Sequence, residues 1–141
     1  LAGHRHPDPV ILKNLFYNGL RGLMRDTDEN SSFFIPEPVR QVKQYLDQHT
    51  QEKVTLHRLA AMAGISVPHL SAEFKRCYAD SPINYLIRQR LQQARYLLLN
   101  RGLSISEIAM KVGYEDIFHF SKLFKKHFGK SPQAVRNQFT D

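Results

Sequence analysis

The sequence is poor in the features that mark secreted and membrane-spanning proteins. It has one cysteine, Cys77, which rules out an internal disulfide and fits a reducing cytoplasm. No uninterrupted apolar run approaches the roughly 18 residues that a membrane-spanning helix needs. The first residues, LAGHRHPDP, contain no apolar signal-peptide core and no initiator methionine. We therefore expect neither secretion nor membrane insertion, and we expect the chain to be a fragment of a longer protein.

Catalytic and metal-binding patterns are also missing. His4 and His6 form an isolated pair, and no Cys/His cluster has the spacing of a metal site. No set of nucleophile, base and oxyanion-stabilising group can be assembled. No stretch alternates apolar and polar residues with the period of two that a strand would show. These absences predict an all-α protein that is not an enzyme, with no catalytic residues, no metal and no cofactor.

The charge of the chain is concentrated in its second part. The 141 residues carry a net charge of +7. Residues 1–52 hold six Lys or Arg against seven Asp or Glu, whereas residues 53–141 hold 14 against six. A basic segment beside a nearly neutral one suggests a polyanionic partner for residues 53–141. Basic charge alone is weak support, because many proteins are basic for solubility.

The chain contains one duplicated segment. GISVPHLSAEFKRCYADSP, at 64–82, returns as GYEDIFHFSKLFKKHFGKSP at 113–132, with one extra residue in the turn of the second copy. Two copies indicate a duplicated supersecondary unit rather than a solenoid. Downstream of the turn the offset is 50, and the identical pairs are His69 and His119, Ser71 and Ser121, Phe74 and Phe124, Lys75 and Lys125, Ser81 and Ser131, and Pro82 and Pro132.

Helical periodicity and capping residues divide the chain into helices. Each copy of the repeat consists of a short helix, a tight glycine-containing turn and a longer helix, which is the helix-turn-helix layout. A capping-box pattern, Ser104 with Glu107, begins the short helix of the second copy. The predicted helices span 9–24, 39–49, 56–63, 67–78, 82–99, 105–111 and 117–128, with a last one beginning at Ser131-Pro132 and a linker at 26–32.

The second helix of each copy has one face without core residues. At about 100° per residue, Leu70, Phe74 and Cys77 cluster on one side of the first, as Phe120, Phe124 and Phe128 do on the second. The opposite faces carry short polar or small residues early and cations late, which suits a major groove: early residues reach base edges and later cations meet phosphates. These residues are Pro68, His69, Ser71, Ala72, Lys75 and Arg76, and then Phe118, His119, Ser121, Lys122, Lys125 and Lys126.

The predicted helix at 82–99 could set the distance between the two faces. Its 18 residues would extend roughly 27 Å. With the flanking turns it could hold the two reading helices about 34 Å apart, which is one turn of B-DNA. A single chain would then read two successive major grooves.

The segment ISEIAMKVGYEDIFHFSKLFKKHFGKSPQAVR resembles the second helix-turn-helix signature of the AraC/XylS family of bacterial transcription regulators, and the resemblance covers about residues 36–139. LAAMAGISVPHLSAEFKR resembles the first, more variable unit. The matching positions of the signature are Ala109, Gly113, Tyr114, Asp116, Phe120, Ser121, Phe124, Lys125, Phe128, Gly129, Ser131, Pro132 and Arg136.

The resemblance implies a seven-helix DNA-binding domain at 36–141. Its first unit would lie at 55–79, its bridging helix at 82–100 and its second unit at 104–129. The resemblance also implies sequence-specific binding at promoters and adds Ile117 to the base-reading positions. Pro68, Ala72, Ile117 and Phe118 depart from a donor-rich pattern, and apolar side chains there could contact thymine methyl groups or leave fewer positions read directly.

The resemblance further implies partners and a location. An activator of this family contacts RNA polymerase in the bacterial cytoplasm, associated with the nucleoid. Residues 1–35 would be the remnant of an upstream domain that binds a small-molecule effector and forms a homodimer, with 9–25 as its terminal helix. The apolar face at 12, 16, 20 and 23 could dock on the domain or dimerise.

Simpler interpretations stand beside these. Lys122, Lys125 and Lys126 could be a solvated face, and a basic helical adaptor that binds an acidic protein is the alternative function. Arg90 and Arg95 are as suited to holding the two units through local ion pairs as to touching phosphate. Such an adaptor would show no preference for duplex sequence, which distinguishes it from a DNA reader.

Overall fold

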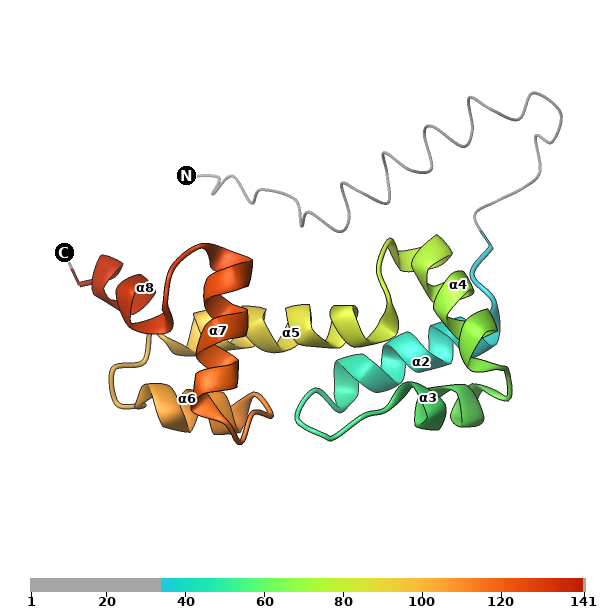
Figure 1. Cartoon of the computed structure of the whole chain (residues 1–141), viewed down its shortest axis with the longest axis horizontal. Coiled ribbons are helices and arrows are strands. Elements are labelled where there is room, and N and C mark those ends of the chain that lie inside the picture. Colours follow the sequence, from blue (N-terminus) through green and yellow to red (C-terminus); the bar gives the residue numbers. More distant parts are fainter. Residues whose placement is uncertain (1–33, 141) are drawn as a thin grey trace, which may run out of the picture.

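The computed structural model describes residues 34–140, which form seven helices and no strand (Figure 1). The predicted all-α class is therefore confirmed, while the helix predicted at 9–24 and the linker at 26–32 lie outside the described residues. None of the described helices is long and apolar enough to cross a membrane. The helices are α2 (Glu37–Gln48), α3 (Leu56–Ala63), α4 (Val67–Tyr78), α5 (Pro82–Leu97), α6 (Ile105–Lys111), α7 (Ile117–Phe128) and α8 (Pro132–Gln138).

Side-chain caps begin most of these helices where the sequence predicts. The Ser66 hydroxyl accepts a hydrogen bond from the backbone N–H of His69 at 3.2 Å, and Ser81 caps α5 in the same way. Ser104 and Glu107 form the complete capping box at the start of α6. Because a cap satisfies an amide that the helix itself leaves free, it fixes the residue at which the helix begins.

Three helix ends differ from the prediction, and the smallest difference is that α2 ends at Gln48 and not at 49. α2 begins at Glu37, two residues earlier than expected, because a proline in the first turn lacks only an N–H that the helix does not use. α5 ends at Leu97 and not at 99 or 100. Beyond it the amides of Leu99 and Asn100 bond to carbonyls three residues back, which is turn geometry.

The chain packs around two separate hydrophobic cores at opposite ends of α5 (Figure 1). The first unit, α2 to α4 with the start of α5, buries Leu46, Leu59, Leu70 and Phe74. The second unit, the rest of α5 with α6 to α8, buries residues that include Leu91, Ile108, Val112, Phe120, Phe124 and Val135. Each unit can therefore be expected to respond separately to a core substitution.

The helices α4 and α7 end at equivalent positions of the repeat, but the residue at that position differs. Ala79 ends α4 with φ of 62°, and Gly129 ends α7 with φ of 79°. A side chain in this left-handed region costs about 1–2 kcal/mol, from which the extra backbone entropy of an unfolded glycine must be subtracted. Added to Gly129, a Cβ would meet nothing within 4 Å, so the difference is one of backbone conformation.

We expect Ala79→Gly to stabilise the protein by about 0.5–1 kcal/mol. Gly129→Ala should destabilise it by a similar amount. Urea unfolding of the two variants would measure both changes. Equal effects of one sign would contradict the backbone explanation.

Candidate nucleic-acid interface

The first turn of α4 is exposed and held by its cap. Gly64 adopts φ of 68° and turns the chain between α3 and α4. Pro68, His69 and Ala72 are exposed, and Ser71 is half-buried at the edge of the same face. Leu70 and Phe74 are fully buried on the other side. The predicted face of the first unit therefore lies on the surface.

α7 repeats this arrangement in the second unit. One carboxylate oxygen of Asp116 accepts hydrogen bonds from the amides of Phe118 at 2.9 Å and of His119 at 3.2 Å. These bonds satisfy the first amides of the helix and fix its direction. His119 and Lys122 are exposed, whereas Ile117 and Ser121 are half-buried at the edge.

The aromatic side chains of α7 divide between the two faces as predicted. Phe120 and Phe124 are fully buried, and Phe128 is half-buried against the same core. Phe118 is 84% exposed, although a phenylalanine this exposed leaves a large apolar surface in water. The exposed ring sits in the first turn, where the sequence predicts contact with bases.

The cations of α4 and α7 differ in exposure and in whether they form an ion pair. Lys75, Lys125 and Lys126 are exposed. Arg76 forms a 2.7 Å ion pair with Glu73, and its side chain is only 25% exposed. The guanidinium also donates to the carbonyl of Phe34 at 3.4 Å. A phosphate would therefore have to share Arg76 with Glu73, and an i,i+3 pair of this kind can be found from the sequence.

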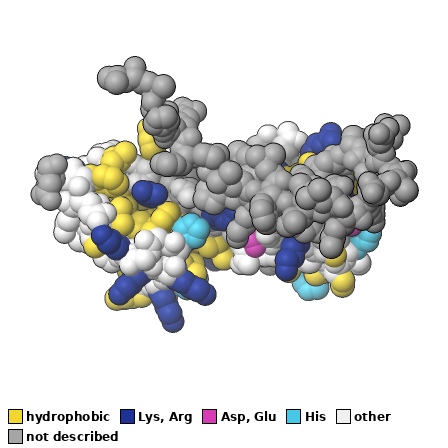
Figure 2. Space-filling model, turned by 90° about the horizontal axis from the view of Figure 1, so that it is seen from above, with side chains coloured by type: hydrophobic (Ala, Val, Ile, Leu, Met, Phe, Trp, Pro, Cys, Tyr) yellow, Lys and Arg dark blue, Asp and Glu magenta, His cyan; other side chains and the backbone are white. Residues whose placement is uncertain are grey.

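Charged side chains gather on the second unit. Figure 2 shows Lys and Arg side chains spreading from the part of the molecule where Figure 1 places α7. Four exposed lysines lie within nine residues there: Lys122, Lys125 and Lys126 on the helix, and Lys130 just beyond it. Lys130 was not among the predicted cations, although its position in the repeat corresponds to Asp80.

The arginines of α5 have three different partners. Arg88 forms an ion pair with Asp80, between α4 and α5. Arg95 lies over the ring of Phe128, with 5.3 Å between the guanidinium carbon and the ring centroid. Arg90 donates from Nε to the carbonyl of Thr50 and from Nη2 to the carbonyl of Glu52, both at 2.6 Å. The sequence left Arg90 open to local ion pairs or to phosphate contact, and its hydrogen-bond partners in the structure are instead backbone carbonyls.

The loop that Arg90 contacts is itself braced. The Tyr45 hydroxyl donates to the Glu52 carboxylate at 2.8 Å, and the Nδ1 atom of His49 lies 2.8 Å from the other oxygen of that carboxylate. These hydrogen bonds, that from Tyr45 first, lower the pKa of Glu52. Glu52 therefore stays ionised at neutral pH and ties the loop to α2.

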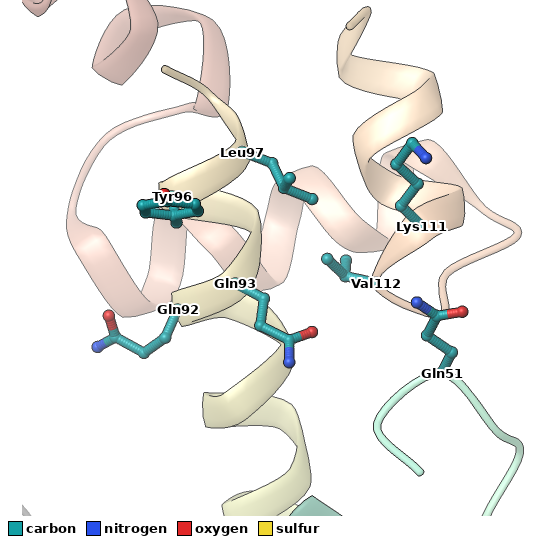
Figure 3. A pocket seen from close by; sticks show the side chains of 7 residues that line it. All are labelled: Gln51, Gln92, Gln93, Tyr96, Leu97, Lys111 and Val112. Atoms are coloured by element: carbon teal, nitrogen blue, oxygen red, sulfur yellow. The ribbon is translucent and has the colours of Figure 1, made fainter. Parts of the chain in front are cut away.

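An open groove lies between the two units, beside this loop (Figure 3). Its volume is about 490 Å³, and side chains from the α2–α3 loop, from α5 and from the end of α6 line it. In Figure 3 Gln93 and Leu97, from α5, lie on one side of it, and Gln51, Lys111 and Val112 lie on the other. The groove marks a region in which the two units are not packed on each other.

The histidines of the described chain do not form a metal site. Within residues 34–140 no group of three or more His, Cys, Asp or Glu side chains could hold a metal ion. His69 and His119 belong to different units, and each stands in the first turn of its exposed helix. Cys77 is buried in the first core, where a thiol acts as a small apolar side chain. The pair at His4 and His6 lies outside the described residues.

Comparison with known proteins gives concordant matches. The profile of a helix-turn-helix domain family matches residues 59–138. An uncharacterised HTH-type transcriptional regulator of Escherichia coli, YdiP, is 42% identical over 101 residues, which cover 72% of this chain and 33% of that protein. The chain thus spans about a third of the length of this relative. The transcriptional activator Btr from Bacillus subtilis is 34% identical over 115 residues, which cover 81% of this chain and 21% of that protein.

Solved structures match the same part of the chain. The C-terminal domain of AraT, a response regulator from Geobacillus stearothermophilus, is 36% identical with a TM-score of 0.69, covering 74% of this chain and 87% of that one. The DNA-binding domain of AdpA, solved in complex with a target DNA, is 28% identical with a TM-score of 0.69, covering 74% and 94%. With two capped helix-turn-helix units in place and more than half of the chain matched, the protein belongs to the AraC family of helix-turn-helix transcription regulators.

Proposed function

We propose that residues 36–141 bind a promoter site with two recognition helices, α4 and α7, in successive major grooves of one duplex. The observation that carries this proposal is the equivalent exposure of the first turns of both helices, each fixed by a side-chain cap. A helix enters the major groove with its first residues at the base edges, and a short polar or small surface there permits close approach. In this arrangement residues 55–79 and 104–129 are the helix-turn-helix segments of the two units, and α5 connects them.

The early residues of each helix would read bases. Lys122 has three donors that can reach acceptors of guanine, and His119 and Ser121 can donate or accept. Phe118 and Ile117 offer apolar surface to thymine methyl groups. The complete predicted set is Pro68, His69, Ser71, Ala72, Ile117, Phe118, His119, Ser121 and Lys122.

The later cations would neutralise phosphates. Lys75 in α4 and Lys125 and Lys126 in α7 are exposed and follow the reading turn by one helical turn. Arg76 belongs to the same predicted set, and its contact would have to accommodate the ion pair with Glu73. Such contacts supply affinity and register but no sequence information.

The protein would act as an activator that contacts RNA polymerase, in the cytoplasm and associated with the nucleoid. Support comes from relatives named as transcriptional activators, Btr at 34% identity and RhaS of Salmonella schwarzengrund at 35%. An upstream domain, of which residues 1–35 would be the end, would bind the effector and form the homodimer. This chain spans only part of its relatives, so these partners belong to the whole protein.

Selection from a pool of random duplexes, at a stated salt concentration, tests the central proposal. We expect a motif with two halves about 10–10.5 base pairs apart, one for each helix. Recovery of unenriched sequences would contradict sequence-specific binding. It would favour the alternative, a basic adaptor for an acidic protein.

The phosphate contacts can be tested by salt dependence. The double variant Lys125→Ala/Lys126→Ala should weaken binding to all sequences about equally, because phosphates carry no sequence information. It should also flatten the plot of log K against log salt by about 1.8, since each phosphate contact contributes about 0.9. Titrations of one duplex between low and high salt would measure the slope.

A matched control removes two cations from α2. Arg40 is paired with Glu37 at 3.5 Å and Lys43 with Asp47 at 2.7 Å. The double variant Arg40→Ala/Lys43→Ala changes the net charge equally, yet its slope should stay at the wild-type value. Equal slopes for all three proteins would refute the phosphate assignment.

A further inference from the structure

We propose that Arg90 is a positioning residue that fixes the orientation of the two helix-turn-helix units, and with it the spacing at which the two halves of a DNA site can be read. This inference rests on the proposed function, because spacing matters only if both units contact one duplex. It adds a residue that touches no DNA to those that decide which sites are bound.

Apolar packing does not fix the angle between the units. The two hydrophobic cores share no residue, although α5 contributes side chains to both. Beside α5 the facing surfaces are separated by the groove that Gln51, Gln93 and Lys111 line (Figure 3). One helix, α5, runs through both units, so the contacts made beside it add to what fixes the angle.

Arg90 provides a connection at the middle of α5. Its planar guanidinium donates from two nitrogens to the carbonyls of Thr50 and Glu52, each at 2.6 Å. Both carbonyls lie in the α2–α3 loop of the first unit, which Glu52 ties to Tyr45 and His49. A charged donor at this distance makes a strong hydrogen bond, and two bonds from one planar group also restrict its orientation.

The same guanidinium contacts the turn of the second unit. Its carbon lies 5.2 Å from the centre of the Tyr114 ring, in cation–π geometry. Gly113, with φ of 101°, lets the turn approach so closely that a Cβ there would stand 3.1 Å from three guanidinium atoms. The Arg90 side chain therefore contacts the backbone of the first unit and the α6–α7 turn of the second unit.

An exposed ion pair marks the same junction. Lys53 lies 3.5 Å from Glu115, which is next to Tyr114, but both side chains are largely in water. Exposed pairs contribute little, at most about 1 kcal/mol. The half-buried Arg90, with its two carbonyl partners, is the stronger candidate for setting the angle.

The consequence for DNA reading follows from helix geometry. Each inserted base pair rotates one half-site by about 34° around the duplex and moves it about 3.4 Å. Two units at a fixed angle accept one spacing well and its neighbours poorly. Units with a loose angle accept several spacings and lose affinity at the best one, because the orientation must be ordered on binding.

The test uses the full chain and the duplex recovered by selection. The segment between the two half-sites is shortened or lengthened by one and two base pairs, and Kd is measured for each duplex. We expect wild type to prefer one spacing by tenfold or more.

Arg90→Met should reduce that preference to about threefold or less and weaken the best complex about fivefold, while the base preference within each half stays unchanged. Arg95→Met, which removes a cation from the same helix but contacts Phe128 within the second unit, should behave as wild type.

A second measurement does not involve DNA. Residual dipolar couplings report whether the two units align as one body, and wild type should need one alignment tensor for both. Arg90→Met should need two. Arg90→Lys, which keeps the charge but has no planar fork, should lie between them and serves for both measurements if Arg90→Met does not fold.

The outcomes separate this inference from the function on which it rests. If wild type selects no sequence and no spacing, the proposed function fails and the spacing role fails with it. If wild type shows a sharp spacing optimum that Arg90→Met and Arg90→Lys retain, with one alignment tensor, only the role of Arg90 is overturned. A broader optimum with unchanged base preference supports both.

Discussion

Phe124→Ala should destabilise the second unit by about 3–5 kcal/mol, because a fully buried phenylalanine leaves a cavity that its neighbours cannot fill. Phe124 lies between Phe120 and Phe128, with ring centroids 5.8 Å and 4.6 Å away. A loss of this size is comparable to the whole stability of a small unit. We therefore expect α6 to α8 to unfold at a temperature at which the first unit remains folded.

Amide hydrogen exchange measures this unit by unit. In Phe124→Ala, amides of α6, α7 and α8 should lose protection, whereas those of α2 to α4 should keep most of theirs, since the two cores share no residue. Uniform loss along the chain would show that the units fold as one. A free energy of unfolding within about 0.5 kcal/mol of the wild-type value would show that Phe124 is not a core residue.

The same helix supplies the control. Phe118→Ala removes an identical side chain that is 84% exposed, and it should change the free energy of unfolding by no more than about 0.5 kcal/mol. The cap of α7 stays in place, because Asp116 bonds to the backbone and not to the ring of Phe118. Both variants replace a phenylalanine of α7 by alanine, so the difference between their free energies of unfolding reports the effect of burial and not that of helix propensity.

Much of this fold could be predicted from the sequence because its signals are local. Serine and aspartate caps act within three residues, so Ser66, Ser104 and Asp116 mark helix starts that the structure confirms. The period of the apolar residues identifies Phe74, Phe120 and Phe124 as core, and all three are fully buried. The repeat adds independent support, since each copy indicates the same arrangement.

The rest depends on contacts between residues far apart in the chain. Arg90 bonds to carbonyls 38 and 40 residues away, and carbonyls have no sequence signature. Gly113 could be expected to form a turn, but its close approach to Arg90 requires both units in place. The predicted end of α5 was two residues too late, because YLLL continues an apolar pattern after the backbone has entered a turn.

Lys122→Ala should weaken binding to the selected site by about 1–3 kcal/mol, which is roughly 5- to 150-fold in Kd. It should have little effect on binding to duplexes in which the base pair read by Lys122 has been changed. Lys122 is exposed six residues after the Asp116 cap, on the face that carries Phe118 and His119. If it donates to a guanine, its removal abolishes discrimination at that base pair alone. Selection repeated with the variant should return the wild-type motif with one position relaxed.

Two controls define what this result means. Lys111→Ala removes an exposed cation from α6, in the same unit but off the predicted face, and it should leave the motif unchanged. Phe118→Ala should relax a position occupied by thymine, because an apolar ring can contact only a methyl group there. If Lys122→Ala weakens all sequences equally, as Lys125→Ala/Lys126→Ala is expected to do, then Lys122 contacts phosphate and base reading by α7 falls to its apolar and short polar residues.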